Sequence, residues 1–361
     1  MHAIEQVLGF TPIMQMIEAI KPGIPNPLPP GFMNVTDRVE NNVAVIHRTY
    51  GQRRLATNVP YGAPAVQAPQ VKIDQVPVIL AHYFEMVRMS PVVLAKLRAF
   101  DKYEFNRGKE MVALQMKNFV QRFVNTRIAA SMSMLVNGKL WFNSAGNMLP
   151  SSSGADAART VDAGISANHQ SQLNGIVGTS WSTTTADILT DINQIKFQSL
   201  KDTGYEIKYA FYGLNIPAYL SQNDYVKYFL ARDSAFNAEY LRNGHIPDGL
   251  FDLKWIPIFT GFFEDQDGTN QNIVANNDLV VFTPDPSPDW WGVVEGGYPV
   301  ATTTDIQSDL MSALNSLDWK TGMFAFSNVA LNPASLDMYH GDTFLPYLKL
   351  PDCVYQLDAV I

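Results

Sequence analysis

Six histidines are the first residues to consider, because imidazole is a common metal ligand and general base in proteins. They are widely separated along the chain, at His2, His47, His82, His169, His245 and His340. No H-E-x-x-H pair and no cluster of cysteine and histidine accompanies them. The sequence therefore does not support a metal site, and we expect no cofactor.

The stretch "FEDQDGTNQNIV" (263–274) has the composition of a calcium-binding loop. With Gly268 at the sixth position of such a loop, Phe263 takes the first position and Val274 the twelfth. Calcium needs carboxylates at both of these positions. Asp267-Gly268 is instead a strong turn signal, so this stretch is predicted to be a β-hairpin.

Two adjacent tryptophans and a single cysteine are the remaining chemical candidates. Because neighbouring side chains of a strand face opposite ways, only one of Trp290 and Trp291 could form a platform for sugars or bases, and core packing is preferred. Nothing near Cys353 would lower the pKa of its thiol, which favours a small buried side chain over a nucleophile. No nucleophile elbow, phosphate-binding loop or dinucleotide fingerprint occurs. We expect that the protein is not an enzyme.

The composition is typical of a folded chain that is kept in a reducing compartment. The 361 residues are 47% apolar, and one cysteine excludes an intramolecular disulfide framework. This length exceeds that of the usual single domain. No apolar run approaches the ~20 residues that a membrane helix needs, and the N-terminus lacks the pattern of a signal peptide.

Charge is divided unequally along the chain. Residues 1–141 hold 16 Lys and Arg against 9 Asp and Glu, a net charge of +7, whereas residues 142–361 hold 10 against 25, a net charge of −15. Together they make up the net charge of −8. Two interpretations stay open: a chance drift between surfaces, or a basic half of one subunit that lies on the acidic half of another.

The first elements of the chain are an arm and a hairpin. A short amphipathic segment ends at Pro22, and five prolines from Pro22 to Pro30 predict an extended arm that cannot form its own core. β-branched and aromatic residues predict strands at 43–50 and 71–84, joined by a Gly- and Pro-rich loop. Because a long hairpin is marginal alone in water, we expect it to contact another chain.

The longest predicted element is a rod. Ser90-Pro91 is a helix start, a pause is expected near Gly108, and an apolar stripe then continues to Asn137-Gly138. The stripe consists of Met111, Val112, Met116, Phe119, Val120, Phe123, Val124, Ile128, Ala129, Met132 and Leu135. Such a helix is well beyond the average globular length, and nothing on it suggests chemistry.

A second, α/β or α+β lobe is predicted after the rod. The residues of 149–181 are rich in Ser, Gly, Ala and Asn and indicate a long irregular surface loop. A helix should follow from about Thr184 to Leu200, with Gly204 after its end. Its expected buried face is made of Ile188, Leu189, Ile192, Ile195 and Leu200. Strands and helices then alternate, which is typical of a separate lobe.

Taken in order, these elements resemble the lambda-like major capsid proteins of tailed bacteriophages, which have the Hong Kong 97 fold. The best local marker is the tail, where "FLPYLKLPD" (344–352) precedes a last strand "CVYQLDAVI" (353–361), and "GTSWS" (178–182) is a weaker one. The resemblance covers nearly the whole chain and implies an α+β fold with five parts. They are an N-terminal arm (1–40), an extended E-loop hairpin (41–86), a peripheral domain with a long spine helix (87–204), an axial domain (205–328), and a return to the peripheral domain with the last strand (329–361).

The resemblance implies a structural subunit that self-assembles into the icosahedral head around phage double-stranded DNA. Hexamers and pentamers would form the shell, without sequence-specific DNA binding or membrane contact, and scaffold, portal and decoration proteins are further expected partners. The protein would be made in the cytoplasm of a host bacterium and end in the virion. Implied E-loop contacts are Arg48, Arg53, Arg54 and Tyr61, and implied core residues of the spine helix are Phe119, Phe123 and Ile128. For the arginines, a solvated state is the alternative to pairing with a neighbouring subunit.

Two departures and three alternatives accompany this interpretation. The hairpin has only Lys72, away from its Arg-rich tip, so lysine-to-asparagine crosslinks between subunits are not expected. No long charged helix precedes the arm, which favours a separate scaffold protein. The alternatives are an encapsulin-like shell of the same fold, an enzyme with an unrecognised site, and a binding module that uses the two tryptophans. The sequence alone does not separate a phage head from an encapsulin.

Overall fold

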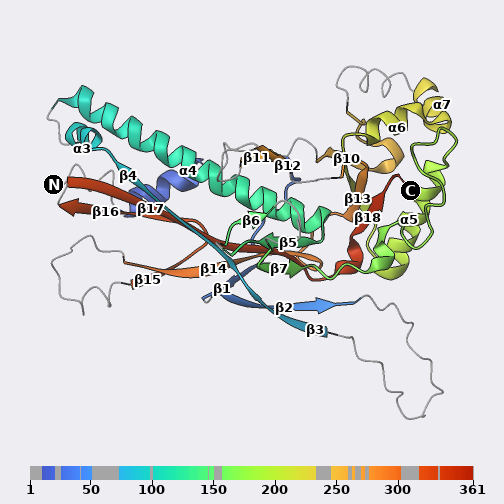
Figure 1. Cartoon of the computed structure of the whole chain (residues 1–361), viewed down its shortest axis with the longest axis horizontal. Helices are drawn as coiled ribbons and strands as arrows, with labels where there is room; N and C mark the ends of the chain where they lie inside the picture. The colour runs from blue at the N-terminus through green and yellow to red at the C-terminus, as the bar shows by residue number, and fades with distance from the viewer. Residues whose placement is uncertain are drawn as a thin grey trace, which may run out of the picture.

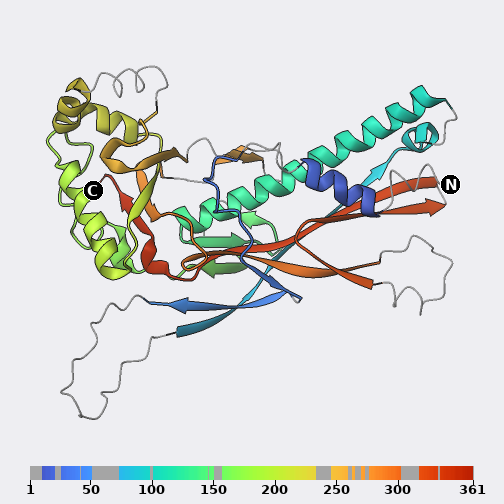
Figure 2. The same ribbon diagram turned by 180° about the vertical axis from the view of Figure 1, so that it is seen from behind.

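A computed structural model of the chain describes residues 10–20, 26–40, 42–50, 73–97, 101–144, 146–149, 157–232, 245–258, 262–264, 270–272, 276–301, 317–331 and 334–360. These residues form two bodies of mixed helix and sheet (Figure 1). One is a six-stranded sheet with the longest helix along it, and the other is a five-stranded sheet that carries three helices. In both Figure 1 and Figure 2, a two-stranded hairpin projects from the side of the larger sheet that lies opposite the long helix.

The long helix is α4 (Lys102–Val136), whose 35 residues span about 52 Å at about 1.5 Å per residue. The side chain of Asp101 caps its first turn. The expected pause at Gly108 is wrong, because α4 is continuous through this residue, and the helix that precedes it is α3 (Pro91–Leu97). A Cβ atom at position 108 would lie 3.1 Å from Cδ2 of Leu97, so glycine there allows α3 to pack closely on α4.

The burial of α4 changes along its length. Up to residue 123 the helix buries a stripe of mainly apolar residues at helical spacing and exposes the opposite face to solvent. All residues from Arg127 to Val136 are buried. Burial on every side is typical of a helix inside a core, so α4 is a surface helix at its beginning and a core helix at its end.

The six-stranded sheet is organised around β17 (Ala334–Leu348), a strand of 15 residues. The other strands of this sheet are β14 (Trp291–Ala301), β16 (Phe324–Leu331), β4 (Ala81–Met89), β1 (Asp37–Val39) and β15 (Leu317–Thr321). Only the three-residue strand β1 pairs parallel, with β14. Because side chains alternate along a strand, Met338, His340, Asp342 and Phe344 of β17 all face α4.

The second body is a sheet in the order β10, β9, β13, β18 and β8. Its strands are β10 (Lys254–Pro257), β9 (Ile207–Tyr212), β13 (Leu279–Pro284), β18 (Tyr355–Asp358) and β8 (Gln170–Ser171). It carries the helices α5 (Ile188–Asp202), α6 (Ile216–Gln222) and α7 (Asp224–Arg232), and the 3-10 turns η3 (Leu250–Asp252) and η4 (Pro351–Cys353) adjoin it. The last strand therefore lies between β13 and β8, which are both distant from it in the sequence.

The two bodies divide the chain differently from the boundaries expected at 204/205 and 328/329. Helix α5 and strand β8, which precede the first boundary, lie in the smaller body, and so does β18, which follows the second. Strand β14, which lies between the boundaries, belongs to the six-stranded sheet. The reason is strand pairing between distant segments, which local sequence patterns do not encode.

The predicted hairpin consists of the antiparallel strands β2 (Val43–Thr49) and β3 (Ile73–Ile79). The expected strand at 71–84 is two strands, because a break at Leu80 separates β3 from β4, which enters the larger sheet. The residues that connect β2 to β3, 51–72, lie outside the described part of the chain.

The base of the hairpin is part of its own subunit's core. Its inward side chains, among them Ala44, Ile46 and Val78, are buried in the main hydrophobic cluster together with Leu80. The base of the hairpin therefore contributes to the core of its own chain. Alternation along the two strands sends every second side chain inward and leaves the others outside.

The N-terminal segments also pack within the subunit. Helix α2 (Phe10–Ile20) buries Ile13 and Ile17 against α4 and the sheet. In the arm, Phe32 is fully buried with its ring at 5.5 to 6.2 Å, edge-on, from four aromatic rings. These rings belong to Tyr209, Phe211, Trp290 and Trp291. The arm has no core of its own, but it completes the core of the subunit.

The surface loop expected at 149–181 is another incorrect prediction. This region contains β7 (Arg159–Asp162), which pairs with β5 (Lys139–Phe142) beside β6 (Met148–Leu149), and the 3-10 turn η2 (Ala167–His169) before β8. Leu173 and Trp181 within it are fully buried. Isolated apolar residues among many small polar ones have no periodicity, so the pattern did not reveal that they are core residues.

Several local predictions are confirmed. Strands β11 (Phe262–Glu264) and β12 (Asn270–Asn272) pair antiparallel, as the hairpin interpretation requires, while their turn lies outside the described residues. Both tryptophans, Trp290 and Trp291, are core residues. Cys353 is buried too, and burial raises the pKa of its thiol to about 12, which keeps it protonated. Helix α5 begins at the N-cap Asp187, slightly later than expected, and leaves Leu200 exposed.

Replacing Phe32 with alanine should lower the free energy of unfolding by about 3–5 kcal/mol, because a fully buried aromatic ring leaves a cavity among four others. Urea unfolding followed by tryptophan fluorescence measures this loss. Phe197→Ala is the matched control, since its ring is 68% exposed, and it should change the free energy by less than about 0.5 kcal/mol. Equal losses for both variants would contradict the assignment of the arm to the core.

Candidate functional site

The strongest polar feature is a buried ionic cluster between α4 and the six-stranded sheet. The guanidinium of Arg127 donates to both oxygens of Asp342, at 2.7 and 2.6 Å, and lies 2.8 Å from Oε1 of Glu295. All three side chains are buried. The guanidinium also lies 5.0 Å from the ring of Phe344. The cluster connects α4 with β17 and β14 where the helix enters the core.

The electrostatics of the cluster favour its charged form. Burial by itself would lower the pKa of Arg127, but the paired carboxylates of Asp342 and Glu295 raise it above its ordinary value. Gly322 makes room for Glu295, because a Cβ atom there would lie 2.5 Å from Oε1, and its φ of +75° suits glycine. On the outer side, Nε of Arg38 lies 3.6 Å from Oε2 of Glu295.

A buried histidine lies beside the cluster on the same face of β17. The ring of His340 stacks on Phe119 of α4 at 3.8 Å, and its Nε2 has no hydrogen-bond partner among the described residues. Burial lowers the pKa of His340 to about 3. The side chain is therefore neutral at physiological pH and acts as a packing residue.

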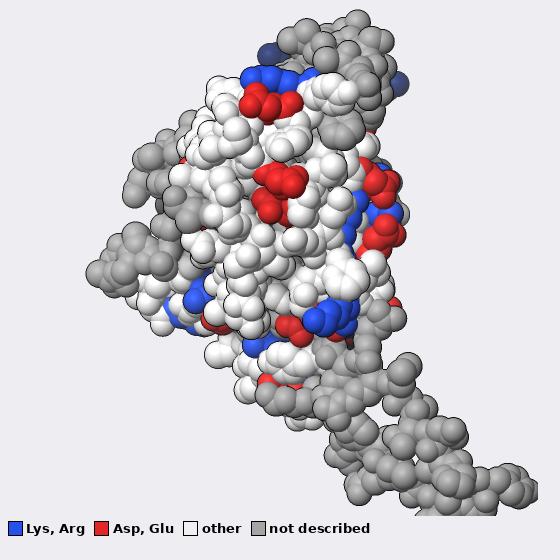
Figure 3. Space-filling model, turned by 90° about the vertical axis from the view of Figure 1, so that its right-hand side faces the viewer, with Lys and Arg blue, Asp and Glu red and all other residues white. Residues whose placement is uncertain are grey.

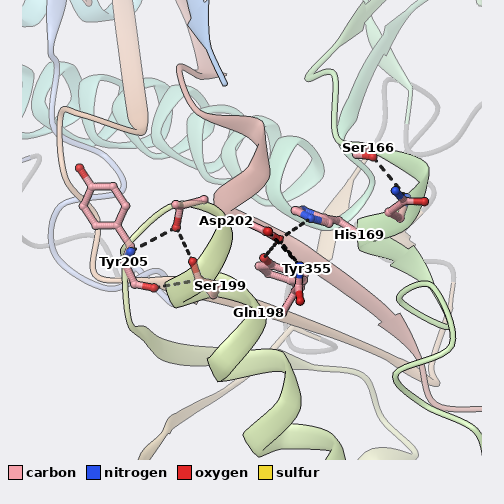
Figure 4. Close-up of polar contacts among 9 residues, drawn as sticks. Ser166, His169, Gln198, Ser199, Asp202, Tyr205 and Tyr355 are labelled. Atoms are coloured by element: carbon pink, nitrogen blue, oxygen red, sulfur yellow. Dashed lines mark hydrogen bonds and ion pairs between the residues drawn. The ribbon is translucent and has the colours of Figure 1, made fainter. Parts of the chain in front are cut away.

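A second polar cluster lies in the smaller body (Figure 4). Asp202 accepts hydrogen bonds from Gln198 at 2.9 and 2.8 Å and from the hydroxyl of Tyr355 at 3.1 Å. Nε2 of His169 lies 3.4 Å from Oδ2 of Asp202, and its ring stacks on Tyr355 at 4.2 Å. Burial, followed by the nearby carboxylate, raises the pKa of Tyr355, so its phenol stays a neutral donor. These side chains point at one another and tie η2 to α5 and β18.

Two apolar surfaces lie on the side of the molecule away from α4, and the first of them is exposed along its whole length. The outer stripe of the hairpin consists of Val43, Val45, Ile73 and Ile79, which are 50 to 56% exposed. The second surface is a row of rings across the six-stranded sheet, with successive centroids as close as 4.9 Å. The row contains His82, Phe84, Tyr298, Phe324, Phe326 and Tyr339. His82 and Phe84 are exposed, whereas Phe324 is buried beneath its neighbours. Apolar patches of this kind on a subunit mark interaction surfaces.

The end of the smaller body carries few charges (Figure 3). The stretch 171–186 has no charged residue, although many of its Ser, Thr, Asn and Gln side chains are exposed. The helices beside it add the exposed side chains Phe197, Tyr225 and Tyr228. A weakly charged surface with exposed aromatic side chains is suited to contact with protein rather than with water alone.

Ion pairs within the subunit already use part of the unequal charge distribution. Among the residues that the structure describes, basic groups of the N-terminal part pair with acidic groups of the C-terminal part in five contacts. They are Arg38–Glu295, Arg88–Asp337, Arg127–Glu295, Arg127–Asp342 and Lys139–Asp162. Part of the opposite charge of the two halves is therefore paired within one chain.

The residues predicted as sites fall into three groups. Arg48 lies at the end of β2, where Nη2 donates to the carbonyl oxygen of Asp162, so it contacts its own subunit. Arg53, Arg54 and Tyr61 lie outside the described residues. The three residues named for the long helix, Phe119, Phe123 and Ile128, are buried on α4.

Sequence reasoning missed Arg127, Glu295 and Asp342. A signal was present, because a single arginine interrupts the apolar stripe of α4 next to Ile128, and a charge inside such a stripe needs a partner. The identity of the partners was not predictable from local sequence.

Neither a metal-binding cluster nor a membrane-spanning helix is found in the described part of the chain. There, no three His, Cys, Asp or Glu side chains come together as a metal site would need. Nor does any helix of those segments combine the length and apolar character that crossing a membrane requires.

The fold is that of phage capsid proteins. It is similar to the putative capsid protein of a prophage of Escherichia coli CFT073, with 13% identity, a TM-score of 0.58, and coverage of 97% of this chain and 99% of that one. It is also similar to a phage-related protein from Bordetella bronchiseptica RB50, with 9% identity, a TM-score of 0.50, and 98% of each chain covered. An encapsulin from Synechococcus elongatus PCC 7942 has a TM-score of 0.43 at 10% identity over 91% of this chain and 85% of that one, too low to carry an argument. No curated protein matches the sequence.

The sequence itself matches the family of phage major capsid protein E over residues 10–295. Because this match covers well over half of the chain, the protein belongs to that family. It is a structural subunit of a phage capsid, and membership of the family implies that it is found in the virion.

Removing the guanidinium of the buried cluster should be strongly destabilising. Arg127→Met leaves two buried carboxylates without their partner and should cost about 3–5 kcal/mol in the free energy of unfolding. Adding Glu295→Gln and Asp342→Asn should recover part of this loss. The control is Arg122→Met on the same helix, whose exposed pair with Glu85 should contribute less than about 1 kcal/mol. Equal losses in the free energy of unfolding for Arg127→Met and Arg122→Met, measured in urea, would refute the stabilising role of Arg127 in the buried cluster.

His340 should make the subunit sensitive to acid. Its pKa in the folded state, about 3, is below the ordinary value of 6.5, so the unfolded chain binds the proton first as the pH falls. Its contribution to stability is complete above about pH 6.5 and declines toward pH 3, by about 1.4 kcal/mol per pH unit. Unfolding of the wild type between pH 7 and 4.5 should show a steeper pH dependence than that of His340→Phe. Equal slopes for wild type and His340→Phe would exclude this role.

Proposed function

We propose that the protein assembles as hexamers and pentamers into the icosahedral head of a tailed phage and that its fold is of the Hong Kong 97 type. The observation that carries this proposal is the single rod α4 along a long sheet, with a hairpin projecting from the opposite side of that sheet. The exposed outer stripe of the hairpin supports it, because an isolated subunit gains nothing from exposing these apolar side chains.

The parts of such a subunit can be assigned from the two sheets. α4 is the proposed spine helix and the six-stranded sheet the peripheral domain. The five-stranded sheet with α5, α6 and α7 is the proposed axial domain, and residues 1–40 are the arm. The E-loop is the hairpin of β2 and β3 with residues 51–72 between them. The proposed domains are therefore defined by the sheet to which each strand belongs, in place of the continuous ranges 87–204, 205–328 and 329–361.

The E-loop is proposed to lie on a neighbouring subunit with its outer stripe, Val43, Val45, Ile73 and Ile79. Burying these four side chains would stabilise the contact, since apolar area contributes about 25 cal/mol per Å² removed from water. Arg53, Arg54 and Tyr61 remain proposed contact residues of the connecting loop. Arg48 is withdrawn from this set, because it lies at the end of β2 and donates to the carbonyl oxygen of Asp162 in its own chain.

The remaining functional proposals follow from a shell around a genome. The shell encloses double-stranded DNA without reading its sequence, has no catalytic activity, and is made in the cytoplasm of a bacterial host. Scaffold, portal and decoration proteins are the proposed further partners. An encapsulin-like compartment is the second candidate, and purified particles distinguish the two, because only a phage head packages DNA.

Shortening the E-loop should separate folding from assembly. Replacing residues 50–72 by Asn-Gly joins β2 to β3 through a tight turn and retains Arg48 and the buried base of the hairpin. The variant should keep the circular dichroism spectrum of the subunit but form no closed particles, as judged by size-exclusion chromatography and electron microscopy. Closed shells formed by this variant would contradict the proposed contact of the connecting loop with a neighbouring subunit.

A charge variant of the full-length chain tests the arginines of the same loop. Arg53→Glu with Arg54→Glu should slow assembly in light scattering at 0.1 M salt, where the Debye length is ~10 Å. The difference from wild type should fall at 1 M salt, where that length is ~3 Å. A difference that does not depend on salt would argue against ion pairing between subunits.

A further inference from the structure

We propose that Glu295 couples the root of the hairpin to the position of α4, because Arg127 of α4 and Arg38 of β1 share its carboxylate. The two contacts lie on opposite sides of the same side chain, at 2.8 Å from Oε1 and 3.6 Å from Oε2. This inference concerns one subunit. It therefore does not depend on the proposed shell or on the contacts of the E-loop tip.

The first argument is the charge of the cluster. Arg127 and Asp342 form a bidentate pair, which is neutral as a unit. Glu295 adds a second negative charge beside the same guanidinium, although its side chain is only 8% exposed. Among the contacts that the described residues make, Arg38 supplies the charge that balances it. The cluster is thus electrically complete only while β1 is in position.

The second argument is the way in which β1 is held. It is a parallel strand of three residues, in which Arg38 lies directly opposite Glu295. Parallel pairing is slightly weaker per residue than antiparallel pairing, so side-chain contacts matter for so short a strand. Asp37 is held by Nζ of Lys349 at 3.2 Å and by the hydroxyl of Tyr347. Although burial alone would raise it, these contacts hold the pKa of Asp37 below its ordinary value.

The third argument is the position of β1 in the chain. β1 ends at Val39, and β2 begins at Val43, so the strand leads directly into the hairpin. The amide of Leu80 donates to the carbonyl oxygen of Asn42 at 2.8 Å, which closes the root of the hairpin. A change in the position of β1 therefore moves the hairpin root and also removes a positive charge from Glu295.

The two contacts of Glu295 should respond differently to salt. The side chain of Arg38 is 68% exposed, so its attraction to Glu295 is screened as ionic strength rises. The guanidinium of Arg127 is buried, and its contact with Glu295 is screened much less. High salt should therefore reproduce the loss of Arg38 without disturbing the inner pair.

Hydrogen exchange of the full-length, unassembled chain tests the coupling. Wild type, Arg38→Gln, Glu295→Gln and the double variant are compared at 0.1 M salt. Arg38→Gln should speed exchange about two- to fivefold, the range of an exposed ion pair, both in residues 34–40 and in residues 123–131 of α4. In the Glu295→Gln background, Arg38→Gln should have no further effect on 123–131, because the shared carboxylate is gone.

Matched controls keep the test decisive. Arg88→Gln removes an arginine of the same sheet whose partner is Asp337 rather than Glu295, so exchange in 123–131 should stay at the wild-type rate. Wild type at 1 M salt should match Arg38→Gln. An unchanged rate in 123–131 for Arg38→Gln, or an effect that persists without Glu295, would overturn the coupling. If Glu295→Gln does not fold, the comparison of wild type and Arg38→Gln at both salt concentrations still shows whether loss of the Arg38 contact speeds exchange in 123–131.

Discussion

The seating of α4 on the sheet depends on the buried contact of Arg127 with Asp342 and Glu295. Buried charges are costly to desolvate, so this cluster is weak evidence for stability but a strong constraint on geometry. If α4 shifted by one turn, about 5.4 Å, the guanidinium would leave both carboxylates unpaired in the core. The stacking of His340 on Phe119 and the packing of the apolar stripe of α4 depend on the same position of the helix along the sheet.

The appendages of the subunit are built with two faces. The inward face of the hairpin and the ring of Phe32 complete the core of their own chain. The outer stripe of the hairpin stays exposed. The same strands thus have a face that serves folding and a face that is left for the proposed contact with a neighbour, which is a consequence of side-chain alternation.

Much of the fold could be predicted from local patterns, and the rest could not for identifiable reasons. The long helix, the hairpin and the buried roles of Trp290, Trp291 and Cys353 all followed from periodicity or local chemistry. The region 149–181 was misjudged because Leu173 and Trp181 are isolated among small polar residues. The pause near Gly108 was misplaced because the role of that glycine is contact with Leu97 in another helix.

The sequence by itself determined the class of protein, the order of its elements and the absence of a recognisable catalytic motif. Periodicity and turn chemistry act between residues close in the chain, so they are visible without a structure. Only the tertiary structure decided which segments share a sheet and which charges meet. Arg127 and Asp342 are 215 residues apart, and β18 pairs with β13 and β8 rather than with the strand before it. Such pairings arise from burial and strand addition across the whole chain, and no local spacing records them.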